Sequence, residues 1–208
     1  MVIDIQVYDG ASLTPGIAIL TEFRLRSFRE FPYLYAGTEE GEQEHMTGYI
    51  ANPTARLLLA RDTDFDEKVV GVAIGTLLST ETEILRQMGE PLRNLGIVPE
   101  EFYYLGEMIF VPGYWRRGIG RQMLEVLKAA GREQGANRFG FLAVFREPND
   151  SRRPAGHIDS GVIFRRFGFE NTNIFVTFDW TTIHADGRVA KSSNRLSFWV
   201  DRKIEENP

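Results

Sequence analysis

The sequence predicts an α/β fold in which helices flank one central sheet, and three observations support this class. Stretches with strand-like and helix-like patterns alternate along the chain. The chain has 208 residues, of which 43% are hydrophobic and 25% charged, which is typical of a soluble globular protein with a sizeable core. No internal repeat or low-complexity segment is present. We therefore expect residues 1–208 to form a single domain.

The N-terminal half is expected to contain a strand, two helices and two further strands. Ile3, Ile5 and Val7 alternate with polar residues, as in a strand with one buried face. Pro15 opens a stretch with apolar residues at helical spacing, and Pro32 ends it. A shorter amphipathic helix and two apolar strands joined by an acidic turn follow. The expected elements are a strand at 3–7, helices between 15 and 32 and at 39–51, and strands at 56–61 and 68–78.

The C-terminal half continues the alternation. A helical insertion interrupted by Gly89 and Pro91 comes first, and the strand after it stops at Pro112. The clearest helix of the sequence follows, with apolar residues every three or four positions. Gly168 ends a last short helix, and two strands close the chain as a hairpin. The expected elements are a helical insertion at about 81–103, strands at 104–111 and 138–145, helices at 118–133 and 160–167, and a hairpin at about 174–200.

Charge and composition exclude several classes of function. The net charge is −5, so a protein that binds nucleic acid through its overall charge is not expected. The longest apolar run is too short for a membrane span, and the first residues lack the basic start of a secretory signal. The chain has no cysteine and only three scattered histidines, so we expect no disulfide and no metal site. These features are consistent with a reducing compartment, and we expect the cytoplasm.

A glycine-rich basic turn is the most informative motif. In the stretch Val111-Pro-Gly-Tyr-Trp-Arg-Arg-Gly-Ile-Gly-Arg121, an expected strand ends and an expected helix begins. The first N–H groups of a helix have no partner within the helix, so they and the helix dipole favour a bound anion. Gly118 and Gly120 let a phosphate approach the backbone. A tight turn with solvated arginines would explain the glycines equally well.

Two other phosphate-binding motifs do not fit this turn. A nucleoside-triphosphate loop requires Gly-Lys-Ser or Gly-Lys-Thr, and no such sequence follows. The dinucleotide fingerprint requires a third small residue, where this chain has Met123.

The segment Trp115-Arg-Arg-Gly118-Ile-Gly120 resembles the acyl-CoA signature of the GCN5-related N-acetyltransferase (GNAT) superfamily, although the family usually has Gln or Arg where Trp115 stands. Two further segments match the family, the strand Glu107-Met-Ile-Phe-Val111 and the helix ending Phe164-Arg-Arg-Phe-Gly-Phe169. The resemblance implies a single mixed, mostly antiparallel sheet flanked by helices.

The resemblance also implies acetyl-CoA as cosubstrate. In the family, the strand before the signature separates from its neighbour and its backbone pairs with the pantetheine arm, which maps here to Ile109, Phe110 and Val111. The Val111 N–H would then polarise the thioester carbonyl. The pyrophosphate would rest on the turn formed by Arg116, Arg117, Gly118, Ile119, Gly120 and Arg121.

Glu107 is the candidate general base for an amine acceptor, because alternation places it on the same face as Ile109 and Val111. The alternative is a glutamate that is merely paired with an arginine. The family's usual acid is a tyrosine, and Phe164 stands in its place.

Other groups near the site are weaker candidates for the acid. Tyr103 and Tyr104 lie on the strand before Glu107, and solvent protonation of the thiolate is a further alternative. His157 stands near the place of the family's usual asparagine, and Asp159 or Ser160 is expected to cap the following helix.

The expected activity is transfer of the acetyl group to a primary amine of a small molecule or peptide. The alternative is a non-catalytic acyl-CoA-binding sensor module, which the missing tyrosine favours. Acidic residues in both segments expected to border the acceptor would suit a cationic amine, although a solvated helix face explains them equally well. They are Glu39, Glu40, Glu42, Glu44, Glu81 and Glu83. The resemblance also implies that a homodimer is a common state, for which the terminal hairpin is a suitable surface.

Overall fold

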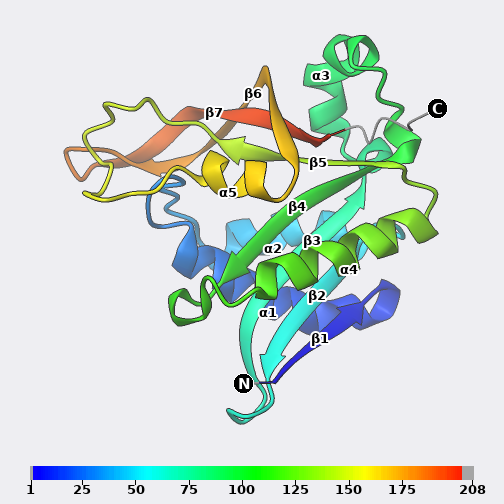
Figure 1. Cartoon of the computed structure of the whole chain (residues 1–208). Coiled ribbons are helices and arrows are strands. Elements are labelled where there is room, and N and C mark those ends of the chain that lie inside the picture. Colours follow the sequence, from blue (N-terminus) through cyan, green and yellow to red (C-terminus); the bar gives the residue numbers. More distant parts are fainter. Residues whose placement is uncertain (1, 203–208) are drawn as a thin grey trace.

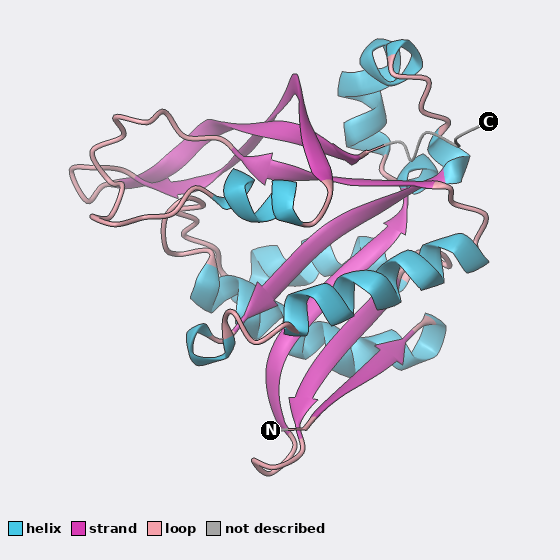
Figure 2. Ribbon diagram, viewed as in Figure 1, coloured by secondary structure: helices cyan, strands magenta, loops and turns pink. Residues whose placement is uncertain are grey.

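The computed structural model describes residues 2–202, which form one seven-stranded sheet with helices on both faces (Figures 1 and 2). The strands lie in the order β1-β2-β3-β4-β5-β7-β6, and only the β4–β5 pair is parallel. The strands are β1 (Ile3–Tyr8), β2 (Arg56–Asp62), β3 (Lys68–Leu77), β4 (Phe102–Phe110), β5 (Arg138–Val144), β6 (Phe169–Ile183) and β7 (Val189–Asp201). The helices are α1 (Leu13–Ser27), α2 (Glu39–Ile50), α3 (Thr82–Asn94), α4 (Ile119–Glu133) and α5 (Ser160–Arg166). The predicted mixed, mostly antiparallel α/β fold is confirmed.

Three apolar clusters hold the helices on the sheet. Helix α4 buries its stripe, including Met123 and Leu127, against one face of the sheet. Helices α1 and α2 pack on the opposite face through Leu20 and Met46, among other side chains. Helix α3 packs against β4 to β7 through Met88 and its neighbours. Each of these fully buried side chains contributes about 1.5–3 kcal/mol to folding.

Strands β4 and β5 separate halfway along the sheet, as the resemblance implies. They are paired only from Phe102 to Tyr104 on β4, opposite Arg138 to Gly140 on β5. Beyond this point β4 continues along β3 and β5 continues along β7, and the two strands run apart in Figure 1. The second half of β4 therefore has a free edge.

A β-bulge at Gly106 determines which way the second half of β4 faces. Leu105 is opposite Gly75 and Glu107 is opposite Ile74, so Gly106 is an extra residue in the strand. A Cβ atom on Gly106 would lie 2.8 Å from Tyr49 Oη, so Tyr49 of α2 packs over the space that a side chain here would occupy. The bulge brings Glu107 onto the face covered by α1 and α2, where Ile109 is also buried.

The C-terminal hairpin is longer than predicted. It extends over residues 169–183 and 189–201 instead of about 174–200, because polar residues at both ends of the hairpin pair in register despite their weak strand pattern. The segment predicted as a helical insertion at 81–103 contains α3, which continues through Pro91, and a short 3-10 turn at Pro99–Glu101.

Candidate active site

The basic turn before α4 has the geometry of an anion site. Gly118 is the N-cap of α4 and has a φ of +83°, a conformation that favours glycine. No side chain caps this helix end, so its first N–H groups face outward beside the exposed Arg116, Arg117 and Arg121. Tyr114 Oη donates to Asp62 Oδ2 at 2.9 Å, which fastens the turn to the end of β2. The Arg117 guanidinium lies 5.2 Å from the centre of the Tyr114 ring.

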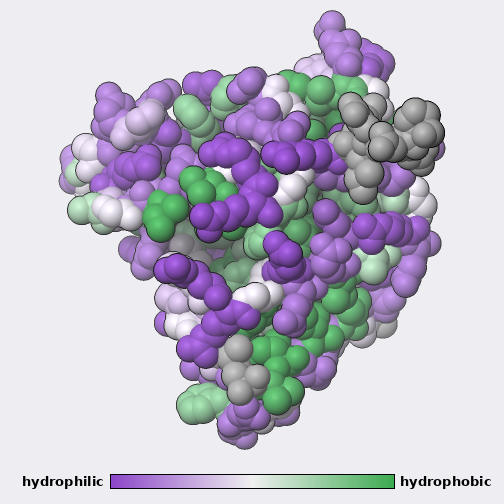
Figure 3. Space-filling view, in the orientation of Figure 1, coloured by the Kyte–Doolittle hydropathy of each residue, from purple (hydrophilic) through white to green (hydrophobic). Residues whose placement is uncertain are grey.

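The end of β4 lies close to this turn. A Cβ atom on Gly120 would be 3.5 Å from the Phe110 ring, so two of the predicted site residues are neighbours. Ile119 is buried with 2% exposure, so only its backbone can meet a ligand. Figure 3 shows that the surface is hollowed between α5 and the start of α4, with both hydrophilic and hydrophobic side chains around the hollow.

The prediction for the Val111 N–H is wrong. This group donates to Val70 O at 2.9 Å, so it belongs to the ladder between β4 and β3 and cannot polarise a thioester. In an antiparallel ladder, successive residues direct their N–H and C=O groups to opposite edges. The backbone groups of Met108 and Phe110 therefore face the free edge, and those of Ile109 face β3. Alternation along an expected strand does not show which edge is paired, which is why this error arose.

Glu107 is held in a buried charge cluster. Arg24 on α1 forms an ion pair with Glu107 Oε1 through Nη1 and bonds Glu42 on α2 through Nε, at 2.5 Å, and through Nη2, at 3.3 Å. The Glu107 side chain is 8% exposed and that of Glu42 is fully buried. Glu107 Oε2 is also buried and has no hydrogen-bond partner among the described residues. The structure thus realises the arginine pairing considered as the alternative, and leaves one carboxylate oxygen free to accept a proton.

Tyr35 and Tyr49 lie near this cluster, and the Glu81 carboxyl lies near Tyr49. Burial, followed by a hydrogen bond to Glu42, raises the pKa of Tyr35 to about 12. Burial, followed by the nearby Glu81 carboxyl, raises the pKa of Tyr49, and burial raises that of Tyr104 further. Burial also raises the pKa of Glu81 to about 7. At neutral pH the tyrosines are therefore neutral hydroxyl groups.

The usual position of the family's acid contains packed aromatic rings. Phe164 lies edge-on to Phe141 at 4.6 Å and to Trp199 at 5.1 Å, so no proton donor replaces the missing tyrosine there. Tyr103 lies in the cluster beneath α4, on the opposite face from Glu107. Asp159 caps α5 by accepting from Gly161 N at 2.7 Å, as predicted. His157 packs edge-on to Phe31 at 4.8 Å and forms no triad with its neighbours.

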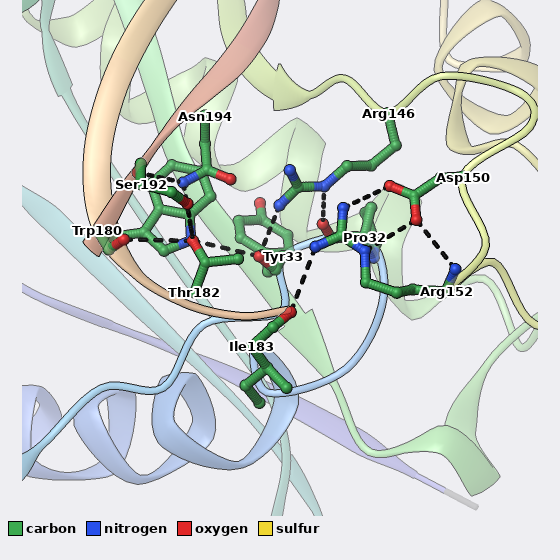
Figure 4. Close-up of polar contacts among 10 residues, drawn as sticks. All are labelled: Pro32, Tyr33, Arg146, Asp150, Arg152, Trp180, Thr182, Ile183, Ser192 and Asn194. Carbon is green, nitrogen blue, oxygen red and sulfur yellow. Dashed lines mark hydrogen bonds and ion pairs between the residues drawn. The ribbon is translucent and has the colours of Figure 1, made fainter. Parts of the chain in front are cut away.

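The loop between α1 and α2 is fastened to the other half of the sheet (Figure 4). Arg146 donates to Pro32 O at 2.7 Å and to Tyr33 O at 2.9 Å, and Arg152 donates to Ile183 O at 3.3 Å. The Tyr33 ring stacks on Phe28, the residue that follows α1, with the ring centres 3.9 Å apart. The loop therefore forms a fixed wall beside the Arg24 cluster.

Replacing Arg146 by methionine tests this wall. Arg146→Met removes two charge-assisted hydrogen bonds to carbonyl groups, each typically worth about 1.5–3 kcal/mol. We expect the KM for the acceptor to rise about tenfold or more, with the dissociation constant of acetyl-CoA changed less than threefold. Steady-state kinetics and calorimetry measure the two values, with the exposed Arg188→Met as the matched control. Equal losses for both substrates would contradict a selective role of this loop wall.

Comparisons with known proteins agree with this geometry. The profile described as "Acetyltransferase (GNAT) family" matches residues 20–154. The chain belongs to the GNAT acetyltransferase family. No curated protein sequence matches it. The family assignment makes the chain an acyltransferase, and the resemblance inferred from the basic turn is confirmed.

Solved structures similar to this chain share its fold at low sequence identity. A mosquito arylalkylamine N-acetyltransferase-like 5b matches with a TM-score of 0.59, 12% identity, and coverage of 95% of this chain and 99% of that one. The Drosophila melanogaster polyamine N-acetyltransferase matches with a TM-score of 0.56, 13% identity and coverage of 95% and 99%. A GNAT acetyltransferase from Elizabethkingia anophelis with acetyl-CoA bound matches with a TM-score of 0.52, 12% identity and coverage of 96% and 97%.

Within residues 2–202 no helix is both long and apolar enough to cross a membrane. In the same part of the chain, no three side chains of His, Cys, Asp or Glu form a group suited to a metal ion.

Proposed function

We propose that this protein is an N-acetyltransferase that moves the acetyl group of acetyl-CoA to a primary amine. The observation that supports it is the free edge of β4, which runs from the candidate proton acceptor to the candidate pyrophosphate site. The Gly118 turn, suited to the pyrophosphate, lies just beyond one end of this edge, and Glu107 with its free oxygen lies at the other.

The reaction needs one group that accepts the amine proton and one hydrogen-bond donor that stabilises the oxyanion. The amine lone pair forms the N–C bond to the thioester carbonyl carbon, and the C–S pair leaves with the CoA thiolate. Glu107 Oε2 takes the amine proton, directly or through a water, and the N–H of Met108 or Phe110 at the free edge stabilises the oxyanion. The thiolate then takes a proton from solvent, since Phe164 leaves no donor at the family's usual place.

Acetyl-CoA would be held by the backbone of β4 and by the turn. Arg116, Arg117 and Arg121 supply positive charge, and the backbone around Gly118, Ile119 and Gly120 supplies donors for the pyrophosphate. Ile109 in β4 and Val111 directly after it take part through their positions, without a free N–H at the edge.

The acceptor we propose is an amine of a small molecule or peptide that can approach as a cation. The neighbours of similar fold include enzymes named for polyamines and arylalkylamines, which supports the amine class. The buried carboxylates Glu42 and Glu107 add negative charge to that side. We retain the cytoplasm as the expected location and a homodimer through the terminal hairpin as the expected assembly.

A non-catalytic acyl-CoA sensor is the second candidate, because Phe164 replaces the usual acid. A label in the acetyl group of acetyl-CoA separates the two functions. The N-acetyltransferase should transfer the label to an amine in a panel of polyamines, arylalkylamines and lysine peptides, in a bond that resists hydroxylamine. A hydroxylamine-sensitive product would indicate an ester, and retention of the label on CoA with every amine would favour the sensor.

A further inference from the structure

Arg24 is the centre of an arrangement that the proposed chemistry does not by itself require. Its guanidinium contacts Glu107 on one side and Glu42 on the other, from three different elements, α1, β4 and α2. The Arg24 side chain is 12% exposed, so the cluster is largely shielded from solvent. In such an environment a removed charge is strongly felt by its neighbours.

The cluster holds two carboxylates against one guanidinium. A lone buried Arg24–Glu107 pair would hold Glu107 firmly as a carboxylate and make it a poor base. Glu42 takes up much of the Arg24 charge through two hydrogen bonds, and Tyr35 bonds Glu42 in turn. Oε1 of Glu107 is therefore fixed by a guanidinium whose charge is shared with a second carboxylate.

The other ionisable groups facing the cluster carry no compensating positive charge. From α2 they are His45 and Tyr49, and from the α1–α2 loop Tyr33 and Tyr35, each of which interacts with Arg24. Tyr104 of β4 and Glu81 at the start of α3 interact with Tyr49, one step further from the cluster. His45 is exposed on α2 with its ring edge-on to Tyr49, and partial desolvation, followed by the charge of Arg24, lowers its pKa, so this histidine is neutral at pH 7.

We propose that Arg24 and Glu42 are positioning residues that set both the orientation and the basicity of Glu107. Arg24 fixes Oε1 and so fixes the position of the unbonded Oε2, and Glu42 balances the Arg24 charge. This inference rests on the proposed role of Glu107 as general base.

Titration of the Glu107 carboxyl tests the proposal without any acceptor. The carboxyl carbon is followed by NMR in glutamate-labelled protein and assigned from its absence in Glu107→Gln. In Glu42→Gln the Arg24 charge is no longer balanced, so the Glu107 midpoint should move down by about one pH unit. In Arg24→Met the cation is lost beside two carboxylates, so the midpoint should move up by about one to three units. Arg24→Lys should return it toward the wild-type value.

Exposed residues of the same helices provide matched controls. Arg26→Met on α1 and Glu40→Gln on α2 remove the same kinds of charge and should leave the midpoint within about 0.3 units. Should Arg24→Met fail to fold, Glu42→Gln and Arg24→Lys still decide the matter. Midpoints that stay at the wild-type value, or move in one direction for both charge removals, would overturn the proposal. Full turnover by Glu107→Gln would instead overturn the base assignment, whatever the titrations show.

Discussion

Glu107→Gln should lower turnover by about 10²–10⁴-fold and leave the affinity for acetyl-CoA nearly unchanged. Glutamine keeps the shape of the side chain and its packing beside Arg24, but it cannot accept the amine proton. Base catalysis of this type typically supplies that factor in rate. Acceptor-dependent release of CoA thiol measures turnover, and calorimetry measures acetyl-CoA binding.

Glu81→Gln is the matched control for this variant. Glu81 is a carboxyl near the same tyrosines whose pKa is raised by burial to about 7, so it is the strongest rival for the role of base. Its substitution should leave turnover within about threefold of the wild type. Turnover of both variants is measured with an acceptor of low amine pKa. Such an amine is already neutral at pH 7, so its own ionisation does not affect the comparison. Loss of activity in Glu81→Gln with full activity in Glu107→Gln would transfer the role to Glu81.

Gly118→Val should abolish acetyl-CoA binding, with a loss of at least about 100-fold in affinity. The site is open, since a Cβ atom there would meet no atom within 4 Å, so the side chain would project into the space that a phosphate needs. The φ of +83° also disfavours a β-branched residue, which would pull the turn away from its present shape. Calorimetry with acetyl-CoA and with a pantetheine thioester lacking the nucleotide measures the effect, which should be larger for acetyl-CoA.

Gly135→Val separates the loss of the anion site from backbone strain. Gly135 follows the other end of α4, has a φ of +90° and also has open space around it. Both variants should therefore lose similar stability, about 1–2 kcal/mol, in thermal unfolding. Only Gly118→Val should lose the ligand. Equal affinities for acetyl-CoA in the two variants would remove the Gly118 turn from the binding site.

The order of helices and strands could be predicted from the sequence because each element carries its own pattern of apolar residues. The turn at Gly118 could also be predicted, since a strand, a glycine-rich basic turn and a helix are adjacent in the chain. The ends of the hairpin could not be predicted. Residues 189–194 are mostly polar, and only their pairing with β6 makes them a strand. The bulge at Gly106 lies against Tyr49 of a distant helix, a contact that no local pattern indicates.

The environment of Glu107 could not be derived from the chain alone. Glu42 was grouped with the exposed acids of its helix, yet it is fully buried because Arg24 lies opposite. One signal was present, since Arg24 stands among the apolar positions of α1, where an unpaired arginine would be costly. Its partners come from elements 18 and 83 residues further along, which no local pattern indicates. Arg146 fixes the α1–α2 loop by donating to two of its carbonyl groups, and no pattern in the sequence indicates this role.

Release of CoA thiol from acetyl-CoA in the presence and absence of amines tests the central claim most directly. The wild-type protein should release thiol only when an accepted amine is present, in a one-to-one ratio with the N-acetylated product. Gly118→Val and Glu107→Gln should both lose this release. Gly118→Val should also lose the binding of acetyl-CoA, whereas Glu107→Gln should keep it. Tight binding of acetyl-CoA by the wild type with no amine-dependent release across polyamines, arylalkylamines and lysine peptides would contradict the account.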